Sequence, residues 1–242
     1  MCAAKAKFSV VSAAVVCIRL VSAIAHHDAA SPPQAGADLK AVSGGGPVVT
    51  EKGGFAGLSK RQRTKPLIAA VHGAALAGGC EIVLSCDLCV ATSNARFGIP
   101  EVKRSLIAAA GGLYRLPRKL PVSIAMECAL TGNPISAQRA YDVGFVNRLV
   151  PESDDNAGAA LAAAMLLAEE ITENAPMAVR MSRDVVAAAA GMDDDALLEL
   201  TNAKFKLVLA TEDFLEGPKA FIEKRAPVWT GKPRAPRPAA KL

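Results

Sequence analysis

Two carboxylates follow a glycine-rich turn in this 242-residue chain. Glu81 ends the segment Ala75-Leu-Ala-Gly-Gly-Cys-Glu81, and Glu101 follows twenty residues later. Gly78 and Gly79 have no Cβ, so a ligand can approach their backbone N–H groups closely. The apolar run after Glu81 predicts that a helix begins at these glycines.

A helix start of this kind can bind a negatively charged oxygen. Its first N–H groups have no partner inside the helix, and the helix dipole is positive at that end. One such oxygen is the enolate that forms when a thioester is attacked at its β-carbon, and two carboxylates could exchange protons beside it. An earlier glycine turn, at Ala35-Gly-Ala-Asp-Leu-Lys40, could supply a second backbone donor. The sequence therefore predicts an oxyanion hole next to an acid–base pair.

The elements that must position these groups follow an α/β pattern. Apolar runs beside glycine or polar residues predict strands at residues 67–72 and 88–92. Helical patterns begin near Asp155, Ala175 and Asp193, where Asp, Asn or Pro favours a helix start. This alternation predicts right-handed crossovers, and periodicity alone allows either a repeated ββα spiral or an open doubly wound sheet.

Four sequence blocks, in order, resemble the crotonase superfamily, also called the enoyl-CoA hydratase/isomerase family. They are AGADLK, KPLIAAVHGAALAGGCE, ARFGIPEVKRSLIAAAGGLYRL and ALTGNPISAQRAYDVGFVNRLVP. The resemblance runs from about residue 35 to about residue 232, and the order and spacing of the blocks make it specific. It implies a crotonase-like ββα spiral with a C-terminal helical oligomerisation layer that builds a trimer or a dimer of trimers.

The same resemblance implies that Glu81 and Glu101 are the catalytic glutamates of a hydratase, which adds water to a 2-enoyl-CoA thioester. The backbone N–H groups of Ala37 and Gly78 would form the oxyanion hole. Isomerases of the superfamily commonly keep only the second glutamate, so an isomerase that uses Glu101 is one alternative. A non-catalytic protein that binds acyl-CoA or only assembles is another. Without the blocks, a first-turn helix charge at Glu81 and a solvated loop charge at Glu101 would explain the pair.

Coenzyme A, as part of the substrate, is expected to contact two regions of the chain, and no separate cofactor is implied. The expected contacts are Ala35, Asp38, Leu39, Lys40, Phe221 and Lys224. A surface lysine would explain Lys40 equally well. The amphipathic end of a helix would likewise explain Phe221 and Lys224.

Composition narrows the other classes of function. The net charge of +5 with few aromatic residues disfavours a nucleic-acid partner, whereas the phosphates of coenzyme A suit some of the positive charge. Arg19 interrupts the N-terminal apolar stretch, which disfavours a membrane span. A small-residue site at Ala23-Ile-Ala25 resembles a signal-peptidase site, but an exported enzyme would lack its coenzyme A substrate. We therefore expect a cytoplasmic protein.

Cysteine and histidine usage predicts no metal site. Cys86 and Cys89 have the spacing of half a zinc site, but no second pair of ligands follows them, so the six cysteines are expected to be reduced thiols. His72 ends an apolar strand, which favours a hydrogen-bonded structural histidine over a catalytic base.

The first 34 residues depart from the family pattern. They lack the strands and the helix that precede the first glycine turn in the family, and an altered reading frame or a misassigned start would explain this. Residues 10–16 and 17–24 could form substitute strands. A smaller departure is Ala108-Ala-Ala-Gly-Gly112, whose methyl groups would lie near the expected acyl site. We divide the chain into an atypical segment (1–34), a spiral core (35–150), a helical region (151–225) and a basic, Pro-rich tail (226–242).

Overall fold

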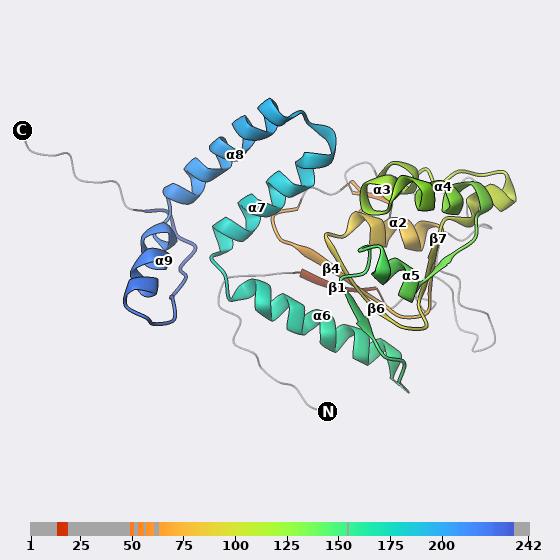
Figure 1. Ribbon diagram of the computed structural model, residues 1–242, viewed down its shortest axis with the longest axis horizontal. Helices are drawn as coiled ribbons and strands as arrows, with labels where there is room; N and C mark the ends of the chain where they lie inside the picture. Colours follow the sequence, from red (N-terminus) through yellow and green to blue (C-terminus); the bar gives the residue numbers. More distant parts are fainter. Residues whose placement is uncertain are drawn as a thin grey trace, which may run out of the picture. The chain divides into compact units, whose positions relative to one another are not determined.

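The computed structural model describes residues 14–18, 49–50, 53–55, 57–60, 63–153 and 155–234 of the chain (Figure 1). The chain divides into two compact units. One comprises Ala14–Ala168, and the other contains the chain from Glu169 onward. The glycine turn at residues 35–40 lies outside the described residues.

Four parallel strands form the main sheet of the first unit, in the order β1-β4-β6-β9. Their bounds are β1 (Ala14–Ile18), β4 (Leu67–Val71), β6 (Leu88–Thr92) and β9 (Arg148–Val150). All five residues of β4 are buried, as expected for the continuous apolar run of an inner parallel strand. The strand predicted at residues 88–92 is confirmed, and the one predicted at residues 67–72 ends one residue earlier.

Smaller sheets accompany the main one. Strands β5 (Ala74–Leu76), β7 (Arg96–Gly98) and β8 (Ile135–Ser136) form a three-stranded sheet in that order, and β2 (Val49–Thr50) pairs with β3 (Gly54–Phe55).

Strands β4, β5, β6 and β7 alternate between the two larger sheets. After β4 and β5 comes helix α2 (Gly78–Ser85), and after β6 and β7 comes the 3-10 helix η1 (Pro100–Arg104). This repeated ββα order confirms the crotonase-like spiral and excludes the open doubly wound sheet.

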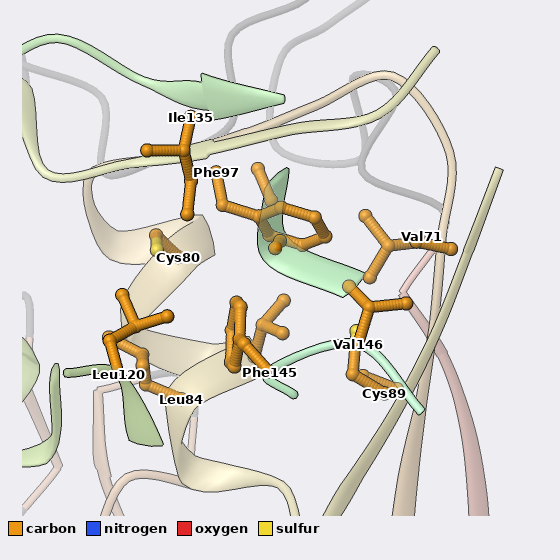
Figure 2. Packing of buried hydrophobic residues seen from close by; sticks show 14 of the residues in the cluster. Val71, Cys80, Leu84, Cys89, Phe97, Leu120, Ile135, Phe145 and Val146 are labelled. Carbon is orange, nitrogen blue, oxygen red and sulfur yellow. The ribbon is translucent and has the colours of Figure 1, made fainter. Parts of the chain in front are cut away.

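A large apolar cluster fills the interior of the spiral. Helices α3 (Gly112–Lys119), α4 (Val122–Thr131) and α5 (Ala137–Asp142) complete the described part of the spiral. Figure 2 shows the cluster, whose labelled members are Val71, Cys80, Leu84, Cys89, Phe97, Leu120, Ile135, Phe145 and Val146. At its centre the rings of Phe97 and Phe145 meet edge to face, with centroids 5.1 Å apart. Because Cys80 and Leu84 lie on α2, the core fixes the helix that carries Glu81.

The described C-terminal part of the chain is helical. The helix bounds are α6 (Asn156–Thr172), α7 (Pro176–Ala188), the short 3-10 helix η2 (Ala189–Gly191), α8 (Asp194–Leu209) and α9 (Asp213–Ile222). The helix starts predicted near Asp155, Ala175 and Asp193 are confirmed. Asp193 is the N-cap of α8, and its side chain accepts a hydrogen bond from the N–H of Ala196 at 2.9 Å.

Strand β1 occupies one edge of the main sheet, where it pairs in parallel with all five residues of β4. It overlaps both of the substitute strands predicted at residues 10–16 and 17–24 but coincides with neither, and the rest of those ranges lies outside the described residues. None of the described helices is both long and apolar enough to cross a membrane.

Candidate active site

The turn before α2 has a backbone conformation that is rare for a residue with a Cβ. Ala77 has φ of 51° and ψ of −129°. Its N–H donates to the carbonyl of Gly98 at 2.9 Å, and its carbonyl accepts from the N–H of Glu81 at 3.0 Å. Strain of this kind persists only where surrounding contacts fix it, and it is concentrated at functional sites. The bond to Gly98 ties the start of α2 to the end of β7, three residues before Glu101.

Gly78 is the first residue of α2, as the sequence predicted. Its N–H is one of the groups that a helix leaves without an internal partner. A Cβ on this residue would lie 2.4 Å from Cζ of Phe55, so the ring of Phe55 packs directly against the glycine. This close contact requires glycine at position 78. Its role as an oxyanion donor stays a prediction, and the other predicted donor, Ala37, lies outside the described residues.

Glu81 lies in the first turn of α2, and the whole residue is only 4% exposed. Its Oε1 accepts a hydrogen bond from the N–H of Gly112 at 2.8 Å. Burial raises the pKa of this carboxyl group, while the backbone of Gly112 and Ala110 and the positive charge of Arg115 oppose the rise. The side chain therefore connects α2 to the start of α3.

Glu101 lies in η1, immediately after Pro100. Its Oε2 is buried, and no group in the described part of the chain forms a hydrogen bond with it. Burial raises the pKa of this carboxyl group, and the negative charge of Glu81 raises it further. A buried carboxyl oxygen without a partner is costly unless a ligand, a water or a proton satisfies it.

The fold brings the two glutamates into one electrostatic neighbourhood. Both glutamates act on the thiol of Cys80. Burial raises the pKa of this thiol to about 12, and the charges of Glu101 and Glu81 act in the same direction. Burial raises the pKa of both carboxyl groups, and the charge of Glu81 makes ionisation of Glu101 less favourable still. This is the arrangement that general acid–base catalysis on one small molecule requires.

Arg115, which is not among the predicted site residues, is a further part of this neighbourhood. Its Nη1 donates to the carbonyl of Ala110 at 3.2 Å, and its Nη2 donates to the carbonyl of Ser59. The only sequence signal for this residue is a cation one helical turn after Gly111-Gly112. Contact with Ser59 depends on the fold and could not be inferred from the local sequence.

The remaining predicted site residues fall into two groups. Ala35, Asp38, Leu39 and Lys40 lie outside the described residues. Phe221 and Lys224 belong to the second compact unit, where the side chain of Phe221 is strongly exposed and Lys224 has a positive φ of 52°. Their contacts with coenzyme A stay predictions.

The cysteines and histidines of the described residues form no recognisable metal centre. Cys80, Cys86, Cys89 and Cys128 are buried free thiols, and no group of three or more His, Cys, Asp or Glu in the described ranges is placed to hold a metal ion. His72 is half-buried and directly follows β4. Its structural role stays a prediction.

Comparison with known proteins identifies relatives over most of the chain. The family pattern described as enoyl-CoA hydratase/isomerase matches residues 34–232. An enoyl-CoA hydratase structure from Mycobacterium marinum is 47% identical, with a TM-score of 0.76, and the match covers 82% of this chain and 76% of that one. An enoyl-CoA hydratase structure from Mycobacterium tuberculosis gives the same identity, TM-score and coverage. The carnitinyl-CoA dehydratase of Salmonella typhi is 39% identical over 205 residues, which are 82% of this chain and 77% of the relative.

Glu101→Gln should stabilise the protein at neutral pH. Below the unfolded-state pKa both states of the wild type are protonated, so the carboxyl group costs nothing. As the pH rises above it, the unfolded state ionises first and the wild type loses stability until the raised folded-state pKa is passed. The expected gain is about 1 kcal/mol or less, the size typical of a single substitution at a partly exposed position.

Urea unfolding at several values between pH 5 and pH 8 measures this difference. The advantage of Glu101→Gln should grow with pH, whereas Glu199→Gln, a change at an exposed glutamate of α8, should stay within about 0.5 kcal/mol of the wild type. A glutamine variant that is less stable than the wild type at pH 8 would contradict the unfavourable burial of Glu101.

Proposed function

Because this chain belongs to the enoyl-CoA hydratase/isomerase family, whose members act on acyl-CoA thioesters, we propose that it adds water to the double bond of a 2-enoyl-CoA. The observation that carries this proposal is the buried, unpartnered Oε2 of Glu101 beside Glu81, whose own Oε1 is held by the N–H of Gly112. A water molecule bound between the carboxyl groups would satisfy the orphaned oxygen and lie next to an acid and a base.

The surroundings of the two glutamates suggest a division of roles. Burial raises the pKa of Glu81, but the N–H of Gly112 and the positive charge of Arg115 oppose this rise and favour the ionised form. Glu101 has the negative charge of Glu81 as its neighbour, which favours the protonated form. We therefore assign Glu81 as the base that takes a proton from water and Glu101 as the acid.

In the reaction, the hydroxyl oxygen of the water bonds to the β-carbon as its proton passes to Glu81. The electron pair of the double bond moves to the thioester oxygen, and the proton of Glu101 then goes to the α-carbon. The enolate oxygen formed between these steps would accept hydrogen bonds from the N–H groups of Gly78 and Ala37. The positive end of α2 adds to this stabilisation.

A second candidate is the removal of water from a hydroxyacyl-CoA. It is favoured by the relatives named carnitinyl-CoA dehydratase, which match 82% of this chain at 38–39% identity. The same two carboxyl groups would act in reverse, with Glu101 as the base at the α-carbon and Glu81 as the acid toward the leaving hydroxyl group. Carnitinyl-CoA and crotonyl-CoA, compared as substrates, distinguish these candidates by the ratio of their kcat/KM values.

Replacing either glutamate with glutamine should abolish hydration. Each change removes a proton carrier but keeps the shape of the side chain, so we expect kcat for crotonyl-CoA to fall by about 10²–10⁴-fold in Glu81→Gln and in Glu101→Gln. Loss of the enoyl absorbance of crotonyl-CoA measures the reaction. Glu199→Gln is the matched control and should keep the wild-type rate.

Other outcomes select the alternatives. Double-bond migration in a 3-enoyl-CoA that depends on Glu101 but not on Glu81, without water addition, would identify an isomerase. A folded wild-type chain that binds an acyl-CoA but catalyses neither reaction would contradict the proposed activity and favour a binding protein.

We also propose that Phe221 and Lys224 contact the coenzyme A part of the substrate, together with Ala35, Asp38, Leu39 and Lys40. Since an exposed charge contact contributes about 0.2–1 kcal/mol, Lys224→Ala should raise KM for crotonyl-CoA by about 1.4- to 5-fold with little change in kcat. KM for the crotonyl thioester of N-acetylcysteamine, which has no phosphates, should not change. Lys206→Ala, at an exposed position in the last turn of α8, is the control. An equal effect on both thioesters would contradict a phosphate contact.

A homo-oligomer is the remaining part of the proposal. The C-terminal helices expose large apolar side chains, among them Leu198, Phe205 and Leu207, and such surfaces commonly pack against other copies of a chain. Light scattering of the purified chain should give the mass of a trimer or of a dimer of trimers, and a monomer at micromolar concentration would contradict this part. Because coenzyme A thioesters are intracellular and the described cysteines are free thiols, we place the protein in the cytoplasm.

A further inference from the structure

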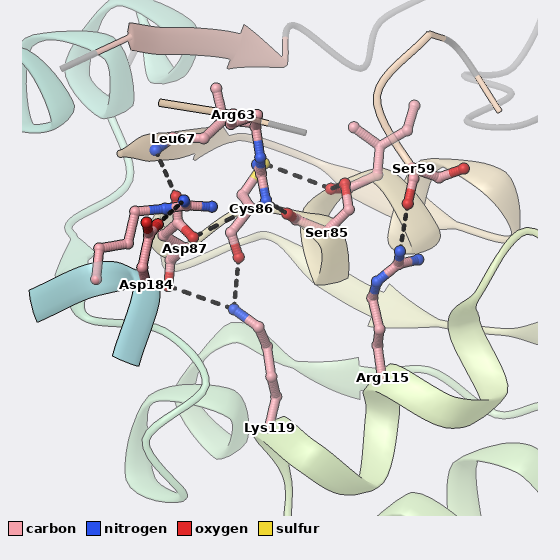
Figure 3. Close-up of polar contacts among 11 residues, drawn as sticks. Ser59, Arg63, Leu67, Ser85, Cys86, Asp87, Arg115, Lys119 and Asp184 are labelled. Atoms are coloured by element: carbon pink, nitrogen blue, oxygen red, sulfur yellow. Dashed lines mark hydrogen bonds and ion pairs between the residues drawn. The ribbon is translucent and has the colours of Figure 1, made fainter. Parts of the chain in front are cut away.

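Arg115 joins two segments that are far apart in the sequence. It lies on α3, and its guanidinium group donates one hydrogen bond to the carbonyl of Ala110 and another to the carbonyl of Ser59, 56 residues away. Figure 3 shows the side chain of Arg115 extending from α3 toward Ser59. A planar guanidinium group suits this task because its donors point in fixed, different directions.

Each carbonyl belongs to a segment that supports one part of the candidate site. Ala110 precedes Gly111-Gly112, and the N–H of Gly112 bonds to Glu81. The hydroxyl oxygen of Ser59 is buried and accepts the N–H of Phe55 at 2.8 Å. The ring of Phe55 in turn packs against Gly78, at the start of α2. Arg115 therefore joins the segment that bonds Glu81, the proposed base, to the segment whose Phe55 ring packs against Gly78, the expected oxyanion donor.

The backbone leaves space for this connection. Gly111 is the N-cap of α3 and has a φ of 113°. A Cβ at this position would lie 1.9 Å from Nη1 of Arg115 and 2.7 Å from the hydroxyl oxygen of Tyr114. The glycine is therefore needed both for its backbone conformation and for the path of the guanidinium group.

The charge of Arg115 also acts on Glu81. Burial raises the pKa of the Glu81 carboxyl group. The N–H groups of Gly112 and Ala110 and the guanidinium group of Arg115 oppose this rise and favour the ionised form. Glu101 of η1 and Cys80 of α2 are the other titratable groups in this neighbourhood. Of these, only Arg115 carries a positive charge.

We propose that Arg115 is a positioning residue that holds Glu81 and Gly78 in register by bonding the carbonyls of Ala110 and Ser59 at the same time. The proposal rests on the proposed hydratase function, because it concerns the geometry of that site. A misplacement of about 1 Å can reduce a rate by about a hundredfold, so the connection would act on kcat rather than on substrate binding.

Kinetics of Arg115→Met and Arg115→Lys test the proposal. Arg115→Met should lower kcat for crotonyl-CoA by about tenfold or more and change KM by less than about threefold. The acidic limb of the kcat/KM profile should move to higher pH, because Glu81 loses a positive neighbour. Arg115→Lys keeps the charge but cannot form both bonds, so its acidic limb should stay near that of the wild type while kcat remains low.

The matched control is Arg118→Met. Arg118 is an exposed residue of the same helix, 5.7 Å from the ring centroid of Tyr114, and its loss should leave kcat and the pH profile unchanged. A kcat of Arg115→Met within about twofold of the wild type would overturn the proposal. So would an Arg115→Lys variant with full activity, since a single charge would then be sufficient.

Hydrogen–deuterium exchange tests the connection without any reaction. Arg115→Met should increase amide exchange at Phe55 and at Gly112, on both sides of the missing contact, and Arg118→Met should not. If the wild type does not hydrate crotonyl-CoA, the proposed function fails and the exchange result alone decides the connection. Exchange that rises on only one side, or equally throughout the fold, would overturn the role of Arg115 as a link.

Discussion

The burial of Glu81 is the constraint on which the rest of the site depends. A carboxylate that is 4% exposed cannot remain ionised unless hydrogen bonds or positive charge replace the water that it loses. The N–H of Gly112, held 2.8 Å from Oε1, and the guanidinium group of Arg115 supply part of this compensation, although burial still raises the pKa of the carboxyl group. Both belong to α3, so Glu81 and the neighbouring helix are positioned by the same interactions.

The second glutamate reaches the site through strand register. In the parallel pairing of β5 with β7, Leu76 lies opposite Gly98. Both strands then leave the sheet in the same direction, one into Gly78 and the other into Glu101. The hydrogen bond from Ala77 to Gly98 closes this junction. A shift of register by two residues would keep every side chain on its face of the sheet but would separate the glutamates, so their proximity is a property of the pairing.

The local parts of this arrangement could be predicted from the sequence. The glycine pair and the apolar run predicted the start of α2, apolar runs predicted β4 and β6, and N-terminal signals predicted the three long helices. The four sequence blocks identified the family correctly, and with it the ββα spiral.

Long-range contacts could not be predicted in the same way. The bond between Arg115 and Ser59 spans 56 residues, and it depends on how α3 packs over the turn after β3. The bounds of strand β1 could not be predicted either, because an apolar stretch does not specify which of its residues will pair with β4.

Charged side chains lie at both ends of helix α2, and their signs are opposite: cations at the C-terminal end and Glu81 in the first turn. At its C-terminal end, Lys119 donates to the carbonyl of Cys86 at 2.6 Å, and Arg63 donates to the carbonyl of Ser85 at 2.5 Å (Figure 3). These cations satisfy carbonyl groups that the helix leaves without partners, and they complement the negative end of its dipole.

At the N-terminal end of α2, Glu81 lies in the first turn, where the positive pole of the helix favours a negative charge. Ala77 is held there in a strained conformation, and no side chain among the described residues caps the helix. Burial lowers the pKa of Lys119 at the opposite end, yet its hydrogen bonds and the nearby side chain of Asp87 favour its charged form. The described part of the chain therefore supplies cations to the carbonyl end of α2 but gives its first N–H groups no side-chain cap. An anionic oxygen at the other end would complete the balance of charge, which is the physical basis for stabilising an enolate beside Glu81 and Glu101.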